Sequence, residues 1–229
     1  MTQAKHILSD FDAALAVLRR DVLRMAELVD HSLEHVLRGL QERNDDLCLK
    51  TIADDDEINQ MEKQIDRDGM ELIVRFQPVA SDLRRVVATM KLSPNLERIA
   101  DESVSIARKV RKLNQHPRLA EVGLLEAMGK YALQMLRDSL AAFVKDDEVS
   151  GRALKERDKA LDAMNKQTAR ELLARAAHDP KQLRGYLNLV LIAASLERVG
   201  DHATNIGEDV VYAVAAEDIR HQRFSPLES

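Results

Sequence analysis

Two short acidic rows, one hundred positions apart, are the residues of this chain whose types and spacing could do chemistry. At steps of four residues the rows contain Glu97, Asp101 and Ser105 in the earlier copy, and Glu197, Asp201 and Asn205 in the later copy. Residues four apart share one face of an α-helix, so each row stacks two carboxylates and a small polar side chain. Apolar residues flank both rows, and a carboxylate held against a core needs a partner or a cation.

The two rows belong to a longer repeat. Both lie in a frame in which Leu-Glu-Arg is followed by an apolar residue, a small residue and Asp, at 96–101 and again at 196–201. Because 39 of the 229 residues are acidic, a single pair at this spacing carries little weight. The same frame twice, with Leu83-Arg84 and Leu183-Arg184 at the same offset, predicts an internal duplication.

A second pair of rows lies upstream of the first. Asp158 and Asp162 are four residues apart, and Asp55 and Asn59 correspond to them at an offset of 103. Neighbouring helices of an antiparallel bundle would bring Asp158 and Asp162 opposite the later acidic row. Carboxylates that converge repel one another, which raises their pKa values or attracts cations.

Oxygen-rich clusters of this kind suit Mg, Ca, Mn or Fe, and no thiolate lies near enough to favour a softer metal. The rows therefore predict one metal site in each half, stronger in the second half because Asn59 and Ser105 are weaker ligands. The alternative is a set of exposed acids paired with nearby cations, namely Arg98, Arg198 or Lys159.

Three further features are weaker candidates. His31 and His35 are four residues apart, but two ligands do not make a zinc site. His202 follows Asp201 and points about 100° away around the helix, so we expect no role for it in the row. A basic cluster complements the dipole at a helix C-terminus, or contacts an anionic lipid or an acidic partner. Its members are Arg108, Lys109, Arg111 and Lys112.

Composition narrows the class of protein. The chain has no Trp, only seven Phe and Tyr residues, and 32% charged residues, a balance typical of an all-α protein. A net charge of −5 argues against nucleic acid as a partner. The single Cys48 suits a reducing compartment, and the sequence lacks a signal peptide and an apolar run of about 18 residues. We expect a soluble, cytoplasmic protein that is not an enzyme, because no nucleophile–base arrangement and no Glu-x-x-His pair occurs.

Apolar periodicity predicts six helices and two tandem three-helix antiparallel bundles. The expected helices are 7–42, 46–75, 81 or 82 to 113, 119–144, 149–177 and 181–216, with Pro94 expected to kink the third. The expected units are a first repeat at 1–116, a second at 117–220 and a flexible tail at 221–229. Asn114 to Pro117 marks the boundary between the repeats.

The paired acidic frames resemble the repeated E(D)xxxD signature of PhoU proteins. Pro-Val-Ala-Ser-Asp-Leu-Arg at 78–84 and Glu-Asp-Val-Val-Tyr at 208–212 resemble the family too, and the resemblance extends from Ile7 to about His221. It implies a duplicated six-helix bundle that restrains phosphate uptake and phosphate-starvation signalling. Its implied partners are the ATPase subunit of a phosphate ABC transporter and a sensor histidine kinase, with the membrane contacted only through them, and a homodimer is expected.

The resemblance also implies metal clusters on the acidic face, with iron, manganese, zinc or magnesium as candidates. Carried over by position, the ligands are Asp158, Asp162, Glu197, Asp201 and Asn205 in the second half, and Asp55, Glu97 and Asp101 in the first half. Two other classes of function stay open at this point. One is a metal-dependent carboxylate-bundle enzyme or metal store, and the other is a helical scaffold indifferent to the acidic rows.

Overall fold

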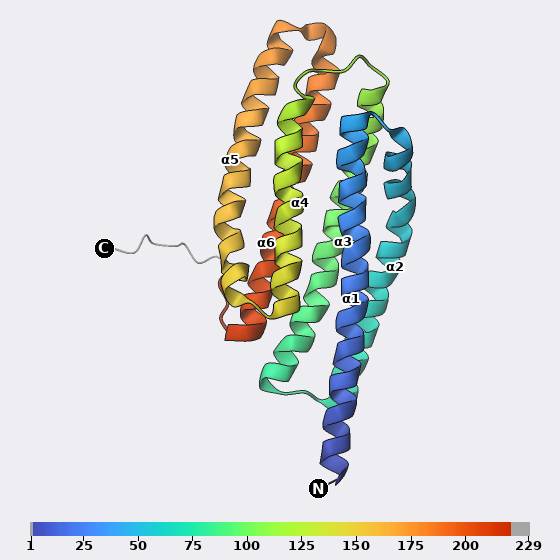
Figure 1. Ribbon diagram of the computed structural model, residues 1–229, viewed down its shortest axis with the longest axis vertical. Coiled ribbons are helices and arrows are strands. Elements are labelled where there is room, and N and C mark those ends of the chain that lie inside the picture. The colour runs from blue at the N-terminus through green and yellow to red at the C-terminus, as the bar shows by residue number, and fades with distance from the viewer. Residues whose placement is uncertain (1, 221–229) are drawn as a thin grey trace, which may run out of the picture.

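Within residues 2–220, the part of the chain that the computed structural model describes, the backbone forms six α-helices, one 3₁₀ turn and no strand (Figure 1). The helices are α1 (Thr2–Glu42), α2 (Asp45–Phe76), α3 (Ala80–Asn114), α4 (Val122–Lys145), α5 (Glu148–His178) and α6 (Leu183–Ala215), with the 3₁₀ turn at Pro180–Gln182. The all-α prediction is confirmed. The predicted tail at 221–229 lies outside the described residues.

Polar caps and turn residues start and stop these helices where the sequence predicts. The Asn44 side chain accepts hydrogen bonds from the backbone N–H groups of Asp46 and Leu47 at 3.0 and 3.3 Å, which caps α2. Asp147 caps α5 in the same way through Val149 and Ser150. At the end of α2, Gln77 adopts a left-handed conformation with φ 47° immediately before Pro78.

Two helices start later than predicted, α6 at Leu183 rather than at Lys181 and α4 by a larger margin. α4 begins at Val122 rather than at Leu119. Leu119 stays in the connecting segment and is buried, and one of its methyl groups would lie 2.8 Å from a Cβ added to Gly185. Burial of Leu119 over the start of α6 thus outweighs continuation of the apolar helical pattern.

Pro94 lies inside α3, and its neighbours compensate for its missing N–H. A proline at this position cannot donate to the carbonyl of Met90, four residues earlier. The Ser93 hydroxyl donates to that carbonyl at 2.9 Å, and the Asn95 amide donates to the carbonyl of Lys91 at 3.1 Å. The helix therefore continues through the proline from Ala80 to Asn114.

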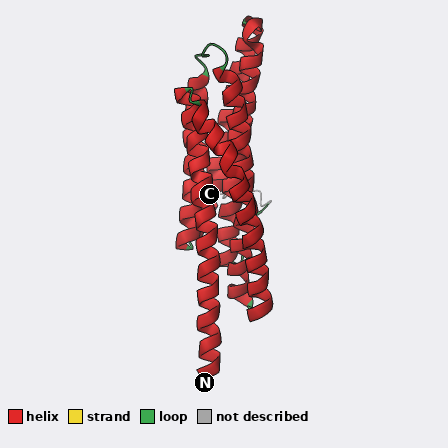
Figure 2. Cartoon of the chain, turned by 90° about the vertical axis from the view of Figure 1, so that its right-hand side faces the viewer, coloured by secondary structure: helices red, strands yellow, loops and turns green. Residues whose placement is uncertain are grey.

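The six helices form two layers. One layer runs in the order α2, α3, α6, α5, and α1 and α4 cover it, with α1 against α2 and α3 and α4 against α5 and α6. α3 and α6 run antiparallel along the seam between the halves, as Figure 1 shows. The helices lie nearly along one axis, and the start of α1 extends beyond the other helices (Figure 2).

A continuous apolar core joins the two layers. Its fully buried members come from both halves and include Met25, Leu33, Ile99, Leu125 and Leu136. No described helix has the length and apolar character needed to cross a bilayer. The core thus fixes α3 and α6, the helices that contain the acidic frames, side by side at the centre of the molecule.

Candidate functional site

Small residues bring α5 and α6 close together beside the second acidic row. A Cβ added to Gly151 would lie 2.7 Å from the carbonyl oxygen of Gly207, and one added to Gly200 would lie 2.4 Å from a methyl group of Leu161. Real Cβ atoms do not approach this closely, so a Cβ at Gly151 would clash with the backbone of α6, and one at Gly200 would require the Leu161 side chain to move. Gly200 and Gly207 therefore mark a close contact of α6 with α5.

This packing brings the acids of α5 and α6 together. Burial, the charges of Asp158 and Asp162 and a hydrogen bond shared with Asp158 raise the pKa of Asp201 to about 6. Burial, the charge of Asp201 and a hydrogen bond shared with Asp162 raise the pKa of Glu197 to about 6. Each acid of α6 therefore lies close to an acid of α5. The carboxylates of α5 and α6 in the second half thus influence one another, and their role as one site stays a prediction.

Asp158 is the innermost acid of this group. Burial and the charges of Asp162 and Glu197 raise its pKa, and its Oδ1 atom is buried with no hydrogen-bond partner. Glu208, one helical turn beyond the row, adds further negative charge at Asp158. Glu208 has an ion pair with Lys155, whose Nζ lies 3.7 Å from Glu208 Oε1. The second half thus concentrates carboxylates around an oxygen that lacks a donor.

The cations proposed as partners in the alternative interpretation mostly bind elsewhere. Arg198 donates to Glu102 of α3 at 3.0 Å, and Lys159 donates to Glu156 at 2.6 Å. Asp162 has an ion pair with Lys166 at 3.7 Å, but the lysine side chain is 67% exposed. Exposed pairs of this kind contribute little. The second row is therefore left with little compensating positive charge.

The first row is compensated from within. Arg98 lies 3.3 Å from Glu97 Oε2 and 3.4 Å from Asp101 Oδ2, and the amide of Asn59 donates to Asp55 Oδ2 at 3.4 Å. Burial and the charge of Asp101 still raise the pKa values of Asp55 and Glu97. Oδ1 of Asp55, like Oδ1 of Asp158, is buried without a partner. The paired-acid interpretation thus describes the first half better than the second.

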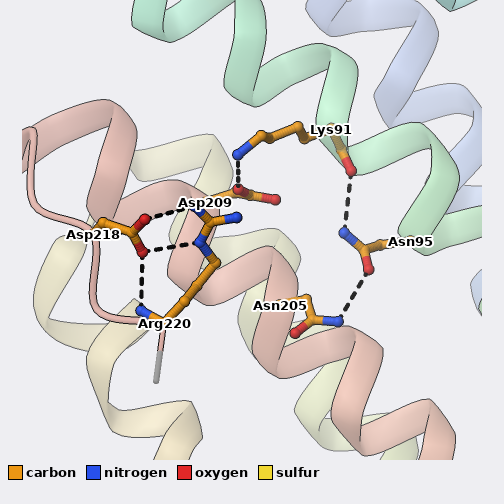
Figure 3. A network of polar contacts seen from close by, with 6 residues as sticks. All are labelled: Lys91, Asn95, Asn205, Asp209, Asp218 and Arg220. Atoms are coloured by element: carbon orange, nitrogen blue, oxygen red, sulfur yellow. Dashed lines mark hydrogen bonds and ion pairs between the residues drawn. The ribbon is translucent and has the colours of Figure 1, made fainter. Parts of the chain in front are cut away.

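The last member of each row lies apart from the carboxylates. Each step of four residues advances by about 40° around a helix, so the third member lies about 80° from the first. Ser105 accepts a hydrogen bond from the side chain of Lys109. Asn205 donates to Asn95 of α3 at 3.4 Å (Figure 3), so it faces the seam between the halves.

A network across the seam was not identified from the sequence. Lys91 of α3 pairs with Asp209 of α6 at 3.1 Å, and Asp218 and Arg220 pair with each other beside it (Figure 3). The Asp209 side chain is only 10% exposed, and burial raises its pKa while Lys91 lowers it. The one sequence signal for this site was an acid immediately before the apolar pair Val210-Val211.

The two other groups singled out in the sequence take no part in the rows. The rings of His31 and His35 stack at 6.4 Å on α1, and burial lowers the pKa of His35. Arg111 and Lys112 lie in the last turn of α3, where they complement the helix dipole.

The donor set has the chemistry of a hard-cation site, although the coordination sphere is not closed. Every donor is an oxygen, and among the predicted ligands that the structure describes each half has one buried carboxylate oxygen without a partner, in Asp55 and in Asp158. In the described part of the chain, no three His, Cys, Asp or Glu side chains are gathered as a ready-made metal site. The residues present fit a cation that would draw carboxylates together from α2 and α3, or from α5 and α6.

Comparison with known proteins identifies the repeats. A family model described as the PhoU domain matches the chain twice, at residues 22–110 and 125–210. The phosphate-specific transport system accessory protein PhoU homolog of Pseudomonas putida is 36% identical over 221 residues, covering 94% of this chain and 85% of that protein. The phosphate-specific transport system accessory protein PhoU of Escherichia coli K12 is 33% identical over 218 residues, covering 95% and 90%.

Solved structures agree. The crystal structure of PhoU from Pseudomonas aeruginosa superposes with a TM-score of 0.87 at 33% identity, over 90% of this chain and all of that chain. The crystal structure of the phosphate transport system regulatory protein PhoU from Streptococcus pneumoniae gives a TM-score of 0.84 at 28% identity, over 91% and 99%. The similarity therefore extends over both repeats and nearly the whole chain.

Proposed function

Because the chain belongs to the PhoU family, we propose that it is a regulatory accessory protein of a phosphate-specific transport system. The observation that carries the proposal is the match of both repeats to the family, together with relatives of that name along almost the full chain. The proposed role is to restrain phosphate uptake and phosphate-starvation signalling without catalysis. Its proposed partners are the transporter's ATPase subunit and the sensor histidine kinase of the phosphate response, and its working form is a homodimer.

The experiment that tests this role removes the gene and measures phosphate-starvation gene expression in phosphate-rich medium. Loss of the protein should raise both that expression and the rate of phosphate uptake. Direct binding to the ATPase subunit, measured with purified proteins, tests the partner. Normal expression and uptake in the deletion strain would overturn the regulatory role.

We further propose that the acidic rows bind divalent cations and that this binding matters for regulation. In the second half, Asp158, Asp162, Glu197 and Asp201 would hold the cation, with Asn205 at the edge. In the first half, Asp55, Glu97 and Asp101 would hold it. The support is the mutual repulsion of the carboxylates, which a divalent cation relieves, and the partnerless oxygens of Asp55 and Asp158.

A cation bound there would neutralise charge and link two helices of one repeat. The carboxylates do not need protons when a cation balances them, so cation binding and protonation compete. Metal content of protein purified without chelator or affinity metal tests the site, with wild type beside Glu197→Ala/Asp201→Ala. We expect the wild type to contain iron or manganese and the variant to contain less of the metal. Equal metal content in the two proteins would show that the second row is not a metal site.

A further inference from the structure

We propose that Glu102 decides which acidic row binds a cation more tightly, by holding Arg198 away from the second row. This inference rests on the proposed cation binding of the rows. It concerns a residue outside both rows, in the half of the molecule that does not contain the second row.

The equivalent arginines of the two repeats point to different carboxylates. Arg98 and Arg198 each follow the Glu of the acidic frame. Arg98 turns back onto its own row and pairs with both Glu97 and Asp101. Arg198 crosses the seam and pairs with Glu102, and within the described residues it has no other ion pair.

One position explains this difference. The residue that corresponds to Glu102 at the offset of 100 is His202. The His202 ring contacts Asn95 Oδ1 at 3.2 Å and offers no carboxylate to an arginine. Arg198 therefore has a carboxylate across the seam, whereas Arg98 has an imidazole at the equivalent position and pairs with its own row.

Glu102 is well placed to hold the arginine. Its side chain is only 15% exposed, and a carboxylate in that environment is costly without a cation. Lys109 lies near enough for its charge to interact with Glu102, but its ammonium group donates to Ser105 instead. Oε2 of Glu102 is buried without any partner, so Arg198 supplies its hydrogen bond through Oε1 alone.

The consequence is an asymmetry between the rows. A divalent cation at the first row must share its carboxylates with the guanidinium of Arg98, and like charges repel. A cation at the second row meets Glu197 and Asp201 without an ion pair to Arg198, whose guanidinium is bonded to Glu102 and reaches the two acids only through its longer-range charge. If Arg198 were released, it could pair with Glu197 and Asp201 as Arg98 does with their counterparts, and cation binding would weaken.

The test is titration of the purified full-length protein with Mn²⁺, following the free ion by electron paramagnetic resonance. In Glu97→Ala/Asp101→Ala only the second row remains to bind Mn²⁺, and in Glu197→Ala/Asp201→Ala only the first row remains. The second row should bind Mn²⁺ more tightly than the first. Glu102→Gln should raise the Kd of the second row about tenfold, the size expected for one added charge a few ångströms away at a protein surface.

Three further variants separate release of Arg198 from a simple loss of negative charge. Glu102→Asp keeps the charge but shortens the reach to Arg198, so it should also weaken the second row. His202→Glu supplies a carboxylate opposite Arg98 and should tighten the first row. Adding Arg198→Gln to Glu102→Gln should restore the second row, because no guanidinium is left to occupy it.

The Arg198 side chain gives a readout that needs no metal. In metal-free wild type Nη1 of Arg198 donates to Glu102, so Glu102→Gln or Glu102→Asp should shift the guanidinium resonances of Arg198 in nitrogen-15 spectra. Thermal unfolding checks that each variant folds; if Glu102→Gln does not, Glu102→Asp and His202→Glu carry the test.

The outcomes are distinct. An unchanged second-row Kd in Glu102→Asp, or equal changes at both rows in Glu102→Gln, would overturn the role of Glu102 and leave the proposed cation binding intact. Wild type that binds no Mn²⁺ at either row would overturn both this inference and the cation part of the proposed function, whereas regulation of phosphate uptake is tested by the deletion strain alone.

Discussion

The two repeats form the same three-helix unit but differ in the residues at the helix contact and beside the acidic rows. In the second repeat Gly200 and Gly207 let α5 approach α6, whereas the first repeat has Ala100 and Ala107 at those positions. Glycine in a helix costs about 1 kcal/mol relative to alanine. That cost is offset by a close helix contact, and the contact is the one that brings Glu197 and Asp201 against the acids of α5.

Charge differs as much as spacing. One turn beyond the acidic row the first repeat has Arg108, which lowers the pKa of Asp55, and the second has Glu208, which raises the pKa of Asp158. In the first half Asn59 stands where the second has Asp162. Duplication has thus kept the backbone that aligns two acidic rows, while substitutions beside them made one row compensated and the other strongly acidic.

The largest effect should come from the helix contact. In Gly207→Ala the new Cβ would lie 2.7 Å from the carbonyl oxygen of Gly151 and 2.6 Å from a methyl group of Leu154. We expect a loss of about 3 kcal/mol in the free energy of unfolding, because overpacking outweighs the gain in helix propensity. The matched change Ala107→Gly should cost only about 1 kcal/mol. Urea denaturation measures both, and equal losses would show that the two contacts are alike.

A smaller effect is expected at the seam. Lys91→Met leaves Asp209 buried without its cation and should cost about 2 kcal/mol, less than a fully buried pair because the lysine side chain is 39% exposed. Lys109, which corresponds to Asp209, donates to Ser105 and has only a longer-range interaction with Glu102, so Lys109→Met should cost less, about 1 kcal/mol. Thermal unfolding compares the two.

Asp209→Asn added to Lys91→Met is the internal control. It removes the unpaired charge and should recover most of the loss. If Lys91→Met alone is neutral, the pair across the seam does not stabilise the protein.

How much of this could be read from the sequence depends on the range of each interaction. Helix boundaries such as Asn44 and Gln77 follow from local chemistry, and the acidic rows follow from periodicity and repetition, so both were predictable. Convergence of Asp158 with Asp201 needed only one assumption, that consecutive helices of a bundle are neighbours.

The side-chain pairs across the seam between α3 and α6 could not be predicted in this way. Lys91 and Asp209 are 118 positions apart, and no local pattern relates them. Whether Arg198 pairs with its own row or with Glu102 depends on how α3 and α6 pack, and the sequence leaves both partners equally open. Position 205 shows a third limit, because the drift of a helical face turned a predicted ligand toward α3.

Exchanging one residue between the rows should move cation affinity from one half to the other. Asp162→Asn removes a carboxylate from the second row, and Asn59→Asp adds the equivalent carboxylate to the first. We expect Mn²⁺ binding to weaken about tenfold in the former and to tighten by a smaller factor in the latter, where Arg98 still competes. Calorimetric titration of each variant measures this, and if Asn59→Asp alone made the two rows equal, Arg98 would not matter.

The smallest effect should be a pH dependence of stability in metal-free protein. Glu197 and Asp201 have pKa values of about 6 in the folded protein, raised from 4.5 and 3.8. Between those limits the folded state holds protons that the unfolded chain has released, so stability falls as the pH rises and changes no further above about pH 7. Because both side chains retain contact with solvent, we expect a loss on the order of 1 kcal/mol.

Variants of the two rows isolate this contribution from that of every other acid. Glu197→Gln/Asp201→Asn removes both groups, so its stability should change less between pH 4.5 and 7 than that of wild type, with chelator present throughout. Glu97→Gln should alter the profile less, because Arg98 favours the charged form of Glu97. Denaturant midpoints at several pH values measure the pH dependence of stability for each protein. Parallel profiles for wild type and the double variant would mean that folding does not raise the pKa values of Glu197 and Asp201. The carboxylates of the second row would then not repel one another more than those of the first.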